Sequence, residues 1–139
     1  MINTKMIKHV VVYGTLRTDD HVNHPGRPDL TDMIRSAGPV EIWASLYDLG
    51  PYPGILLDGG GTVQAEILEI VDPRAISLMD VYEEYDPSNP EQSEYLRIPI
   101  QLEEHGIEAW VYVYNFPLKP DQRIDNPDWL DYLKQREAA

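Results

Sequence analysis

Two neighbouring acids, Glu83 and Glu84, end a stretch whose apolar residues have helical spacing. Asp72 and Pro73 are typical of a helix start, so a helix is predicted over residues 73–84. Its apolar stripe consists of Ala75, Leu78, Met79 and Tyr82. Glu83 borders this stripe and Glu84 faces further out, so Glu83 is the better candidate for a half-buried general acid and base of raised pKa. The alternative is that both acids only solvate the end of the helix.

A second candidate for chemistry is the turn formed by Tyr13, Gly14, Thr15 and Leu16. It follows three consecutive valines, which predict a strand over residues 7–13 that is buried on both faces. Gly14 allows a sharp turn and the close approach of another group. Backbone N–H groups in such a turn lack ladder partners and can bind an oxyanion or a carboxylate. The alternative is a buried strand followed by an ordinary glycine turn.

The composition restricts the classes of function. The chain has 139 residues, which suits a single domain over residues 1–139. Its net charge of −13 opposes binding to nucleic acids and to anionic membrane surfaces. The absence of cysteine excludes disulfides, thiol catalysis and thiolate metal sites, and it is compatible with the cytoplasm, where we expect the protein. Residues 1–8 do not resemble a signal peptide, and no stretch is long and apolar enough to predict a membrane span.

The remaining sequence alternates between strand patterns and turns. Further strands are predicted over residues 42–49, 55–57, 62–71, 95–103 and 107–115, with helices over 28–37 and 125–133. Tyr52 lies in a rigid turn over residues 50–54, where it could line a pocket. Tyr112 belongs to an aromatic face of the strand 107–115, which core packing alone would also explain.

Three polar residues have structural interpretations at this stage. Arg97 is expected to form an ion pair, with Asp80 as one candidate partner. His21 and His24 have a spacing that could suit a metal, but without a third ligand nearby a surface loop is the better interpretation.

Five separated motifs occur in an order that resembles one known family. They are Val-Val-Tyr-Gly-Thr-Leu-Arg at 11–17, Leu-Tyr-Asp-Leu-Gly at 46–50 with Tyr-Pro-Gly at 52–54, Met-Asp-Val-Tyr-Glu-Glu-Tyr at 79–85, Tyr-Leu-Arg at 95–97, and Ile124 with Asp-Trp at 128–129. Together they resemble the gamma-glutamyl cyclotransferase-like family, in particular its gamma-glutamylamine cyclotransferase-like branch. Asn23-His24 also fits the family pattern and suggests that Asn23 helps to fix the first loop. The chain departs from the pattern at Glu84 and Pro127, where the family usually has glycine.

The resemblance implies an α+β fold, a small mixed β-barrel flanked by a few helices, with a pocket at the end of the first strand. It implies conversion of a gamma-glutamyl amine or amino-acid conjugate to 5-oxoproline and a free amine. Glu83 would be the general acid and base, and the substrate would be held by Tyr13, Gly14, Thr15, Leu16, Tyr52 and Tyr112. Neither a metal nor a cofactor is expected, the small-molecule substrate is the only partner, and the protein is expected to be a monomer or a small homo-oligomer.

The alternative function is a non-catalytic binding module of the same fold for a small carboxylated ligand. The presence of Glu83 favours the enzyme, because a buried carboxylate does not help to bind an anion.

Overall fold

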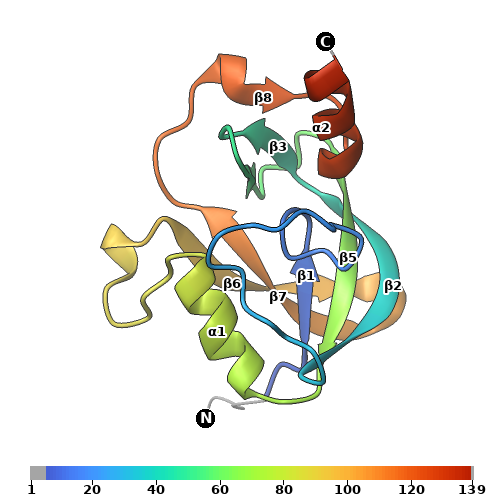
Figure 1. The fold of residues 1–139 in the computed structure, drawn as a ribbon, viewed down its shortest axis with the longest axis vertical. Coiled ribbons are helices and arrows are strands. Elements are labelled where there is room, and N and C mark those ends of the chain that lie inside the picture. The colour runs from blue at the N-terminus through green and yellow to red at the C-terminus, as the bar shows by residue number, and fades with distance from the viewer. Residues whose placement is uncertain (1–5, 139) are drawn as a thin grey trace.

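The structure is a computed structural model that describes residues 6–138. Its main sheet has β1 (His9–Val12) at the centre. Its other strands are β2 (Ile34–Trp43), β5 (Thr62–Ile70), β6 (Tyr95–Leu102) and β7 (Ile107–Tyr114). The strand order is β2-β5-β1-β7-β6 (Figure 1). β1 pairs antiparallel with β5 and parallel with β7, so both of its edges are hydrogen-bonded. Val10, Val11 and Val12 are buried, which confirms the prediction of a strand covered on both faces.

A second, three-stranded sheet has the order β4-β3-β8, formed by β4 (Pro53–Leu56), β3 (Ser45–Asp48) and β8 (Arg123–Ile124). The predicted α+β class is confirmed, but the predicted small mixed β-barrel is wrong. Within residues 6–138, β2 and β6 are the two edges of the main sheet and do not pair with each other. The chain leaves β2 at Trp43 and enters β3 at Ser45, so it passes into the second sheet instead of closing the first. The architecture is an α+β fold with two open sheets.

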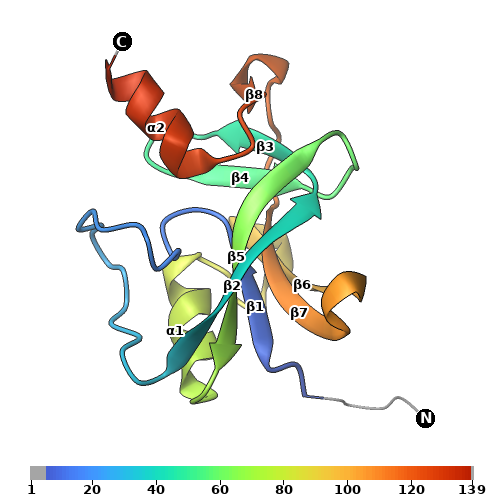
Figure 2. The ribbon, with the colours of Figure 1, turned by 90° about the vertical axis from the view of Figure 1, so that its right-hand side faces the viewer.

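Two helices accompany the sheets. α1 (Arg74–Tyr82) lies on one face of the main sheet, where Ala75 and Met79 pack with Val10 and Val12 of β1. α2 (Trp129–Ala138) lies beside the second sheet (Figure 2), and its Trp129 is buried in the core that the two sheets share. The predictions of a helix over 73–84 and of a C-terminal helix are therefore confirmed, although α2 begins and ends later than predicted. The shorter 3-10 helices are η1 (Pro90–Gln92), η2 (Glu103–His105) and η3 (Pro120–Gln122).

The helix predicted over residues 28–37 is wrong. The segment forms turns up to Met33 and then enters β2, which pairs with β5 along its whole length. Asp32 adopts a left-handed φ of 66°, which ends any helical path before it could form a second turn. Gly38, which directly follows the predicted helix, lies at an irregularity of the β2–β5 register with φ 103°. The apolar side chains Leu30, Met33 and Ile34 do face the core, but from a turn and a strand.

None of the helices in the described part of the chain is long and apolar enough to cross a bilayer.

Candidate active site

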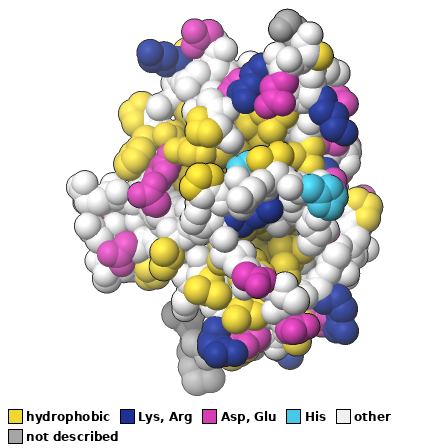
Figure 3. Space-filling model, viewed as in Figure 1, with side chains coloured by type: hydrophobic (Ala, Val, Ile, Leu, Met, Phe, Trp, Pro, Cys, Tyr) yellow, Lys and Arg dark blue, Asp and Glu magenta, His cyan; other side chains and the backbone are white. Residues whose placement is uncertain are grey.

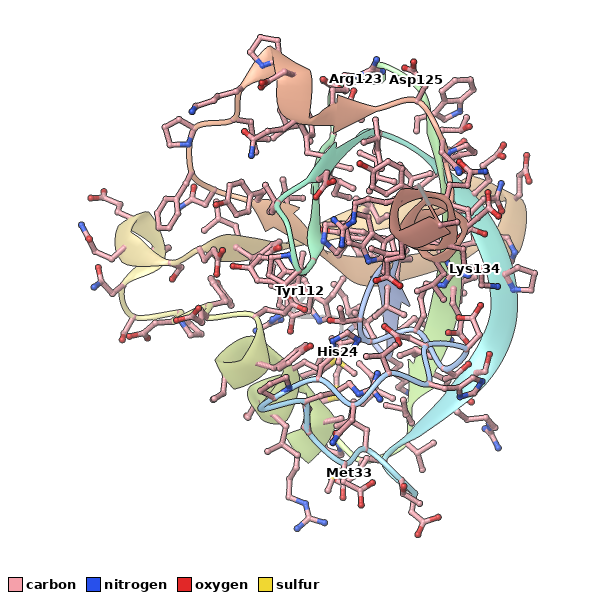
Figure 4. The ribbon with its side chains drawn as sticks, turned by 45° about the horizontal axis from the view of Figure 1, so that its top comes forward. His24, Met33, Tyr112, Arg123, Asp125 and Lys134 are labelled. Atoms are coloured by element: carbon pink, nitrogen blue, oxygen red, sulfur yellow. The ribbon has the colours of Figure 1, made fainter. Side chains whose placement is uncertain are left out.

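A pocket of about 490 Å³ opens at the carboxyl end of β1. Its wall is formed by the turn after β1, the turn before β4, the C-terminal end of α1 and the start of β6. The residues predicted from sequence to form a site all line this pocket: Tyr13, Gly14, Thr15, Leu16, Tyr52, Glu83 and Tyr112. Two of the lining residues, His24 and Tyr112, lie near the centre of the view in Figure 4. Away from them lie Arg123 on β8, Asp125 directly after β8, and Lys134 on α2.

Glu83 directly follows α1 and caps its C-terminal end. Its backbone N–H donates to the carbonyl of Met79 (2.9 Å), which continues the helical hydrogen bonding by one residue. The residue is half-buried in the wall of the pocket, and its carboxyl group has no hydrogen-bond or ion-pair partner within residues 6–138. Burial, and to a smaller extent the negative charge of Glu94, raises the pKa of Glu83 to about 8. A carboxyl group of this kind can both accept and return a proton near neutral pH.

The turn after β1 is held by side chains on its outer side. The guanidinium of Arg27 donates to the carbonyl of Thr15 (3.0 Å), and the hydroxyl groups of Thr15 and Tyr82 are hydrogen-bonded (2.7 Å). The Arg17 N–H closes the turn on the carbonyl of Gly14 (3.0 Å). Among the described residues, the N–H groups of Gly14, Thr15 and Leu16 donate to no other protein atom. They are therefore available to a ligand in the pocket.

Gly14 is required for packing. A β-carbon at this position would lie 2.6 Å from Cγ and 2.8 Å from Cδ of Pro53, which are distances that no real side chain adopts. The close approach expected at Gly14 is therefore made by Pro53, the first residue of β4. This contact joins the turn after β1 to the start of β4 on one side of the pocket.

A network of buried polar groups lies behind the pocket. The carboxylate of Asp80 accepts hydrogen bonds from Arg97 Nε (2.8 Å) and from the hydroxyl of Tyr112 (2.7 Å), and the backbone carbonyl of Tyr112 accepts one from the hydroxyl of Tyr13 (2.6 Å). The Arg97 guanidinium also lies 4.3 Å from the ring centroid of Trp110. The structure thus shows the ion pair that was expected for Arg97. Burial and the neighbouring Asp80 raise the pKa of Tyr112, so this side chain stays neutral and presents its ring to the pocket.

The sequence did not identify three further lining residues. Glu94 lines the pocket together with Glu83 and accepts a hydrogen bond from the Tyr52 hydroxyl (2.7 Å), and burial raises the pKa of Glu94. Tyr95 donates to the carbonyl of Pro53 (2.6 Å) and fixes the turn that carries Tyr52. His24 is held through Nε2 by the buried Asp20 (2.8 Å). The only signal for Glu94 was an acid directly before an alternating strand, which is too common to single it out.

Two smaller expectations concern the loop that follows the turn after β1. Asn23 is exposed and forms no side-chain hydrogen bond within the described residues, so Arg27 and Thr15, not Asn23, provide the contacts that fix the loop. His21 is exposed and His24 bonds to Asp20, and no group of three possible metal ligands occurs in residues 6–138.

Glu84 occupies a backbone conformation that favours glycine. Its φ is 53°, and the following Tyr85 N–H donates to the carbonyl of Asp80 (2.8 Å), which is the hydrogen bond of a helix end with a left-handed residue. The departure from the family pattern at this position therefore leaves the turn intact. Its consequence is an additional carboxylate in the wall of the pocket.

Comparison with known proteins gives the family. The family model described as gamma-glutamyl cyclotransferase, AIG2-like, matches residues 10–131. A gamma-glutamylcyclotransferase family protein, YtfP, of Citrobacter rodentium is 33% identical over 122 residues, which cover 88% of this chain and 95% of that protein.

Solved structures agree with this assignment. The solution structure of YtfP from Escherichia coli matches with a TM-score of 0.64 and 31% identity over 89% of this chain and 97% of that chain. An AIG2-like protein of Mus musculus matches with a TM-score of 0.55 and 28% identity over 84% and 82% of the two chains. With a pocket at the end of its first strand and this match along most of its length, the chain belongs to the gamma-glutamyl cyclotransferase, AIG2-like family.

Proposed function

We propose that the protein cyclises a gamma-glutamyl amide to 5-oxoproline and releases the free amine, with Glu83 as general acid and base. The observation that carries the proposal is the carboxyl group of Glu83, which has no partner among the described residues and lines the same pocket as the free N–H groups of the 13–16 turn. A carboxyl group whose pKa is raised in the folded protein costs stability where it is ionised, and groups of this kind are common at functional sites. Proton transfer is the role that we assign to it.

The reaction moves two protons and consumes no water. The substrate's α-ammonium loses a proton to ionised Glu83, and its nitrogen attacks the γ-amide carbonyl carbon to form the ring C–N bond. The bond to the leaving nitrogen then breaks as Glu83 returns the proton to it. The second proton of the former ammonium passes to the same amine, which leaves as an ammonium ion. One carboxyl group with a pKa of about 8 is suited to both directions of transfer.

The turn after β1 supplies the hydrogen bonds of the proposed site. The N–H groups of Gly14, Thr15 and Leu16 are suited to hold the γ-carbonyl oxygen as it gains charge, or the substrate carboxylate. The substrate must also be bent so that its amine reaches its own amide, and the rings of Tyr52 and Tyr112 would restrict it to that shape.

The test is incubation with a panel of gamma-glutamyl amines and peptides, with 5-oxoproline as the product measured. We expect turnover of at least one member by the wild-type protein and a fall of roughly 10²- to 10⁴-fold in Glu83→Gln. Binding of 5-oxoproline without any turnover across the panel would overturn the enzyme proposal and support the binding module instead.

A further inference from the structure

His24 differs in charge from the other ionisable residues around the pocket. Glu83, Glu84 and Glu94 all belong to the lining, and His24 is the only described lining residue whose side chain can carry a positive charge. It comes from the loop between β1 and β2, whereas the acids come from the end of α1 and from the segment before β6. A γ-glutamyl group carries an α-ammonium, which suits the acids, and an α-carboxylate, which needs a different partner.

The imidazole of His24 is held by a buried carboxylate. Its Nε2 is hydrogen-bonded to Oδ2 of Asp20 (2.8 Å), whose side chain is 1% exposed and whose Oδ1 accepts from the backbone N–H of Val22 (2.9 Å). Because a carboxylate only accepts, the proton of this hydrogen bond belongs to Nε2. The other ring nitrogen, Nδ1, forms no hydrogen bond within residues 6–138. The ring is therefore fixed through one nitrogen and available to a ligand through the other.

Asp20 shares its negative charge with a second cation. Nη1 of Arg27 lies 3.9 Å from Oδ1 of Asp20 and donates to the backbone carbonyls of Asp20 (3.1 Å) and Thr15 (3.0 Å). In Figure 3, dark blue and cyan side chains lie over the loop between β1 and β2 at the centre of the face, next to hydrophobic side chains. Since Arg27 already compensates Asp20, a protonated His24 adds a positive charge to this wall of the pocket.

A series of contacts connects this cluster with Glu83. The hydroxyl of Thr15 is hydrogen-bonded to that of Tyr82 (2.7 Å), and Tyr82 directly precedes Glu83. Burial raises the pKa of Tyr82, and the charges of Glu83, Arg27 and Asp20 also act on this phenol. The acid and the basic cluster thus lie near the same side chain. A substrate whose ammonium and carboxylate share one α-carbon requires two oppositely charged groups at such close quarters.

We propose that His24, as an imidazolium, binds the α-carboxylate of the γ-glutamyl group through Nδ1 and selects for ligands that carry it. This inference rests on the proposed function. With the carboxylate at His24, the α-ammonium is directed to Glu83. The free N–H groups of the turn after β1 then hold the γ-carbonyl oxygen alone, so that each polar group of the γ-glutamyl part has its own partner.

The experiment compares two lactams that differ by one carboxylate, 5-oxoproline and 2-pyrrolidinone. In calorimetric titrations of the wild-type protein we expect 5-oxoproline to bind about 10-fold or more tightly than 2-pyrrolidinone, because the hydrogen bond to its carboxylate is charge-assisted. Glutamine keeps an N–H donor for Asp20 but cannot be protonated. His24→Gln should therefore lose most of this preference and bind 2-pyrrolidinone within about twofold of the wild type.

His21→Gln is the matched control. It removes an imidazole from the same loop, at an exposed position that does not line the pocket, so both affinities should stay as in the wild type. A purely structural role of His24 predicts a different pattern from ours. Loss of the loop conformation in His24→Gln would weaken the binding of both lactams together and leave their ratio unchanged, which would overturn the inference.

Kinetics measure the same preference on substrates. The pair consists of a gamma-glutamyl amide that is turned over and the 4-aminobutanamide of the same amine, which lacks only the α-carboxylate and cyclises to 2-pyrrolidinone. The ratio of their kcat/KM values should fall by about 10-fold or more in His24→Gln and stay unchanged in His21→Gln.

The outcomes distinguish the two proposals. Equal binding of the two lactams by the wild-type protein, or a preference for 5-oxoproline that persists in His24→Gln, would overturn the inference and leave the cyclotransferase standing. If no amide is turned over, the proposed function fails, and the lactam pair still decides the inference. If neither lactam binds, the kinetic ratio decides it, and a lack of turnover as well would overturn both proposals.

Discussion

Asp80 and Glu83 lie three residues apart at the end of α1, where Asp80 is buried and Glu83 is half-buried in the wall of the pocket. Asp80 is met by Arg97 from β6 and by the Tyr112 hydroxyl from β7. No group within the described residues donates a hydrogen bond to the carboxyl group of Glu83, and, besides burial, the negative charge of Glu94 contributes to raising its pKa. The helix places both acids towards the interior, and the neighbouring strands decide which is neutralised by a partner and which remains available for proton transfer.

The largest expected effect is on turnover. Glu83→Gln removes the acid and base while keeping the shape of the side chain, and we expect kcat to fall by roughly 10²- to 10⁴-fold. The measurement is 5-oxoproline formation on a substrate that the wild-type protein turns over, with circular dichroism to establish that the fold is kept. Glu104→Gln, at an exposed position of η2, serves as the charge-matched control. Full activity in Glu83→Gln together with loss of activity in Glu84→Gln would assign the proton transfer to Glu84 instead of Glu83.

The next effect is on stability. Asp80→Ala leaves the guanidinium of Arg97 and the hydroxyl of Tyr112 without their partner, and we expect the free energy of unfolding to fall by about 3 kcal/mol. Chemical denaturation measures this loss. Glu69→Ala breaks an exposed pair with Arg35 and should cost less than about 1 kcal/mol. Equal losses in the two variants would mean that the Asp80 network contributes no more than a surface ion pair.

A pH series sharpens the contrast at Glu83. Its pKa is raised from an ordinary 4.5 to about 8 in the folded protein, so between these values the folded state holds a proton that the unfolded state has released. The contribution of Glu83 to the free energy of unfolding of the wild type is therefore fully present below about pH 4.5 and is lost as the pH rises to about 8. Glutamine does not titrate. The free energy of unfolding of Glu83→Gln should therefore rise relative to that of the wild type across this pH window, by roughly 1–3 kcal/mol after allowance for partial exposure. A stability difference that stays constant from pH 4.5 to 8 would contradict the raised pKa.

The pH profile of activity gives an independent measure of the same group. If Glu83 must be ionised to accept the ammonium proton, kcat/KM should rise from acid with its lower limb well above the value of a free glutamate. A limb at an ordinary carboxylate pKa, or one that persists in the residual activity of Glu83→Gln, would assign the titration to another residue.

The smallest expected effect concerns Tyr112. Its hydroxyl bonds to Asp80 and only its ring remains for the pocket, so Tyr112→Phe should cost about 1–2 kcal/mol of stability and change KM less than threefold. Denaturation and steady-state kinetics on the same preparation test both parts. A large rise in KM with unchanged stability would indicate that the hydroxyl binds substrate directly.

Much of the fold and of the candidate site could be predicted from local patterns. The three valines of β1, the alternating residues of β6 and β7 and the apolar stripe of α1 each carry the periodicity of the element that they form. The same periodicity put Glu83 at the edge of the buried stripe. The Tyr13 to Leu16 turn was predictable because a strand buried on both faces must end where glycine lets the chain turn.

Other features depended on contacts between distant residues. Residues 28–37 have apolar spacing that suits a helix, but the exposed edge of β5 offers a continuous row of backbone partners, and pairing with it outweighs the weak local preference. The sheet stays open because the chain after β2 enters the second sheet, which no periodicity encodes. Glu94 and Glu84 are neighbours only through a backbone hydrogen bond that closes the intervening loop.

The sequence by itself thus determined the elements, the family motifs and the acid that borders the core, because these depend on residues close together in the chain. The tertiary structure decided which strands pair, which carboxylates receive a cation and which do not, and how far the pocket extends. Those properties depend on burial and on the charges of residues brought from other elements, and both arise only when the chain has folded.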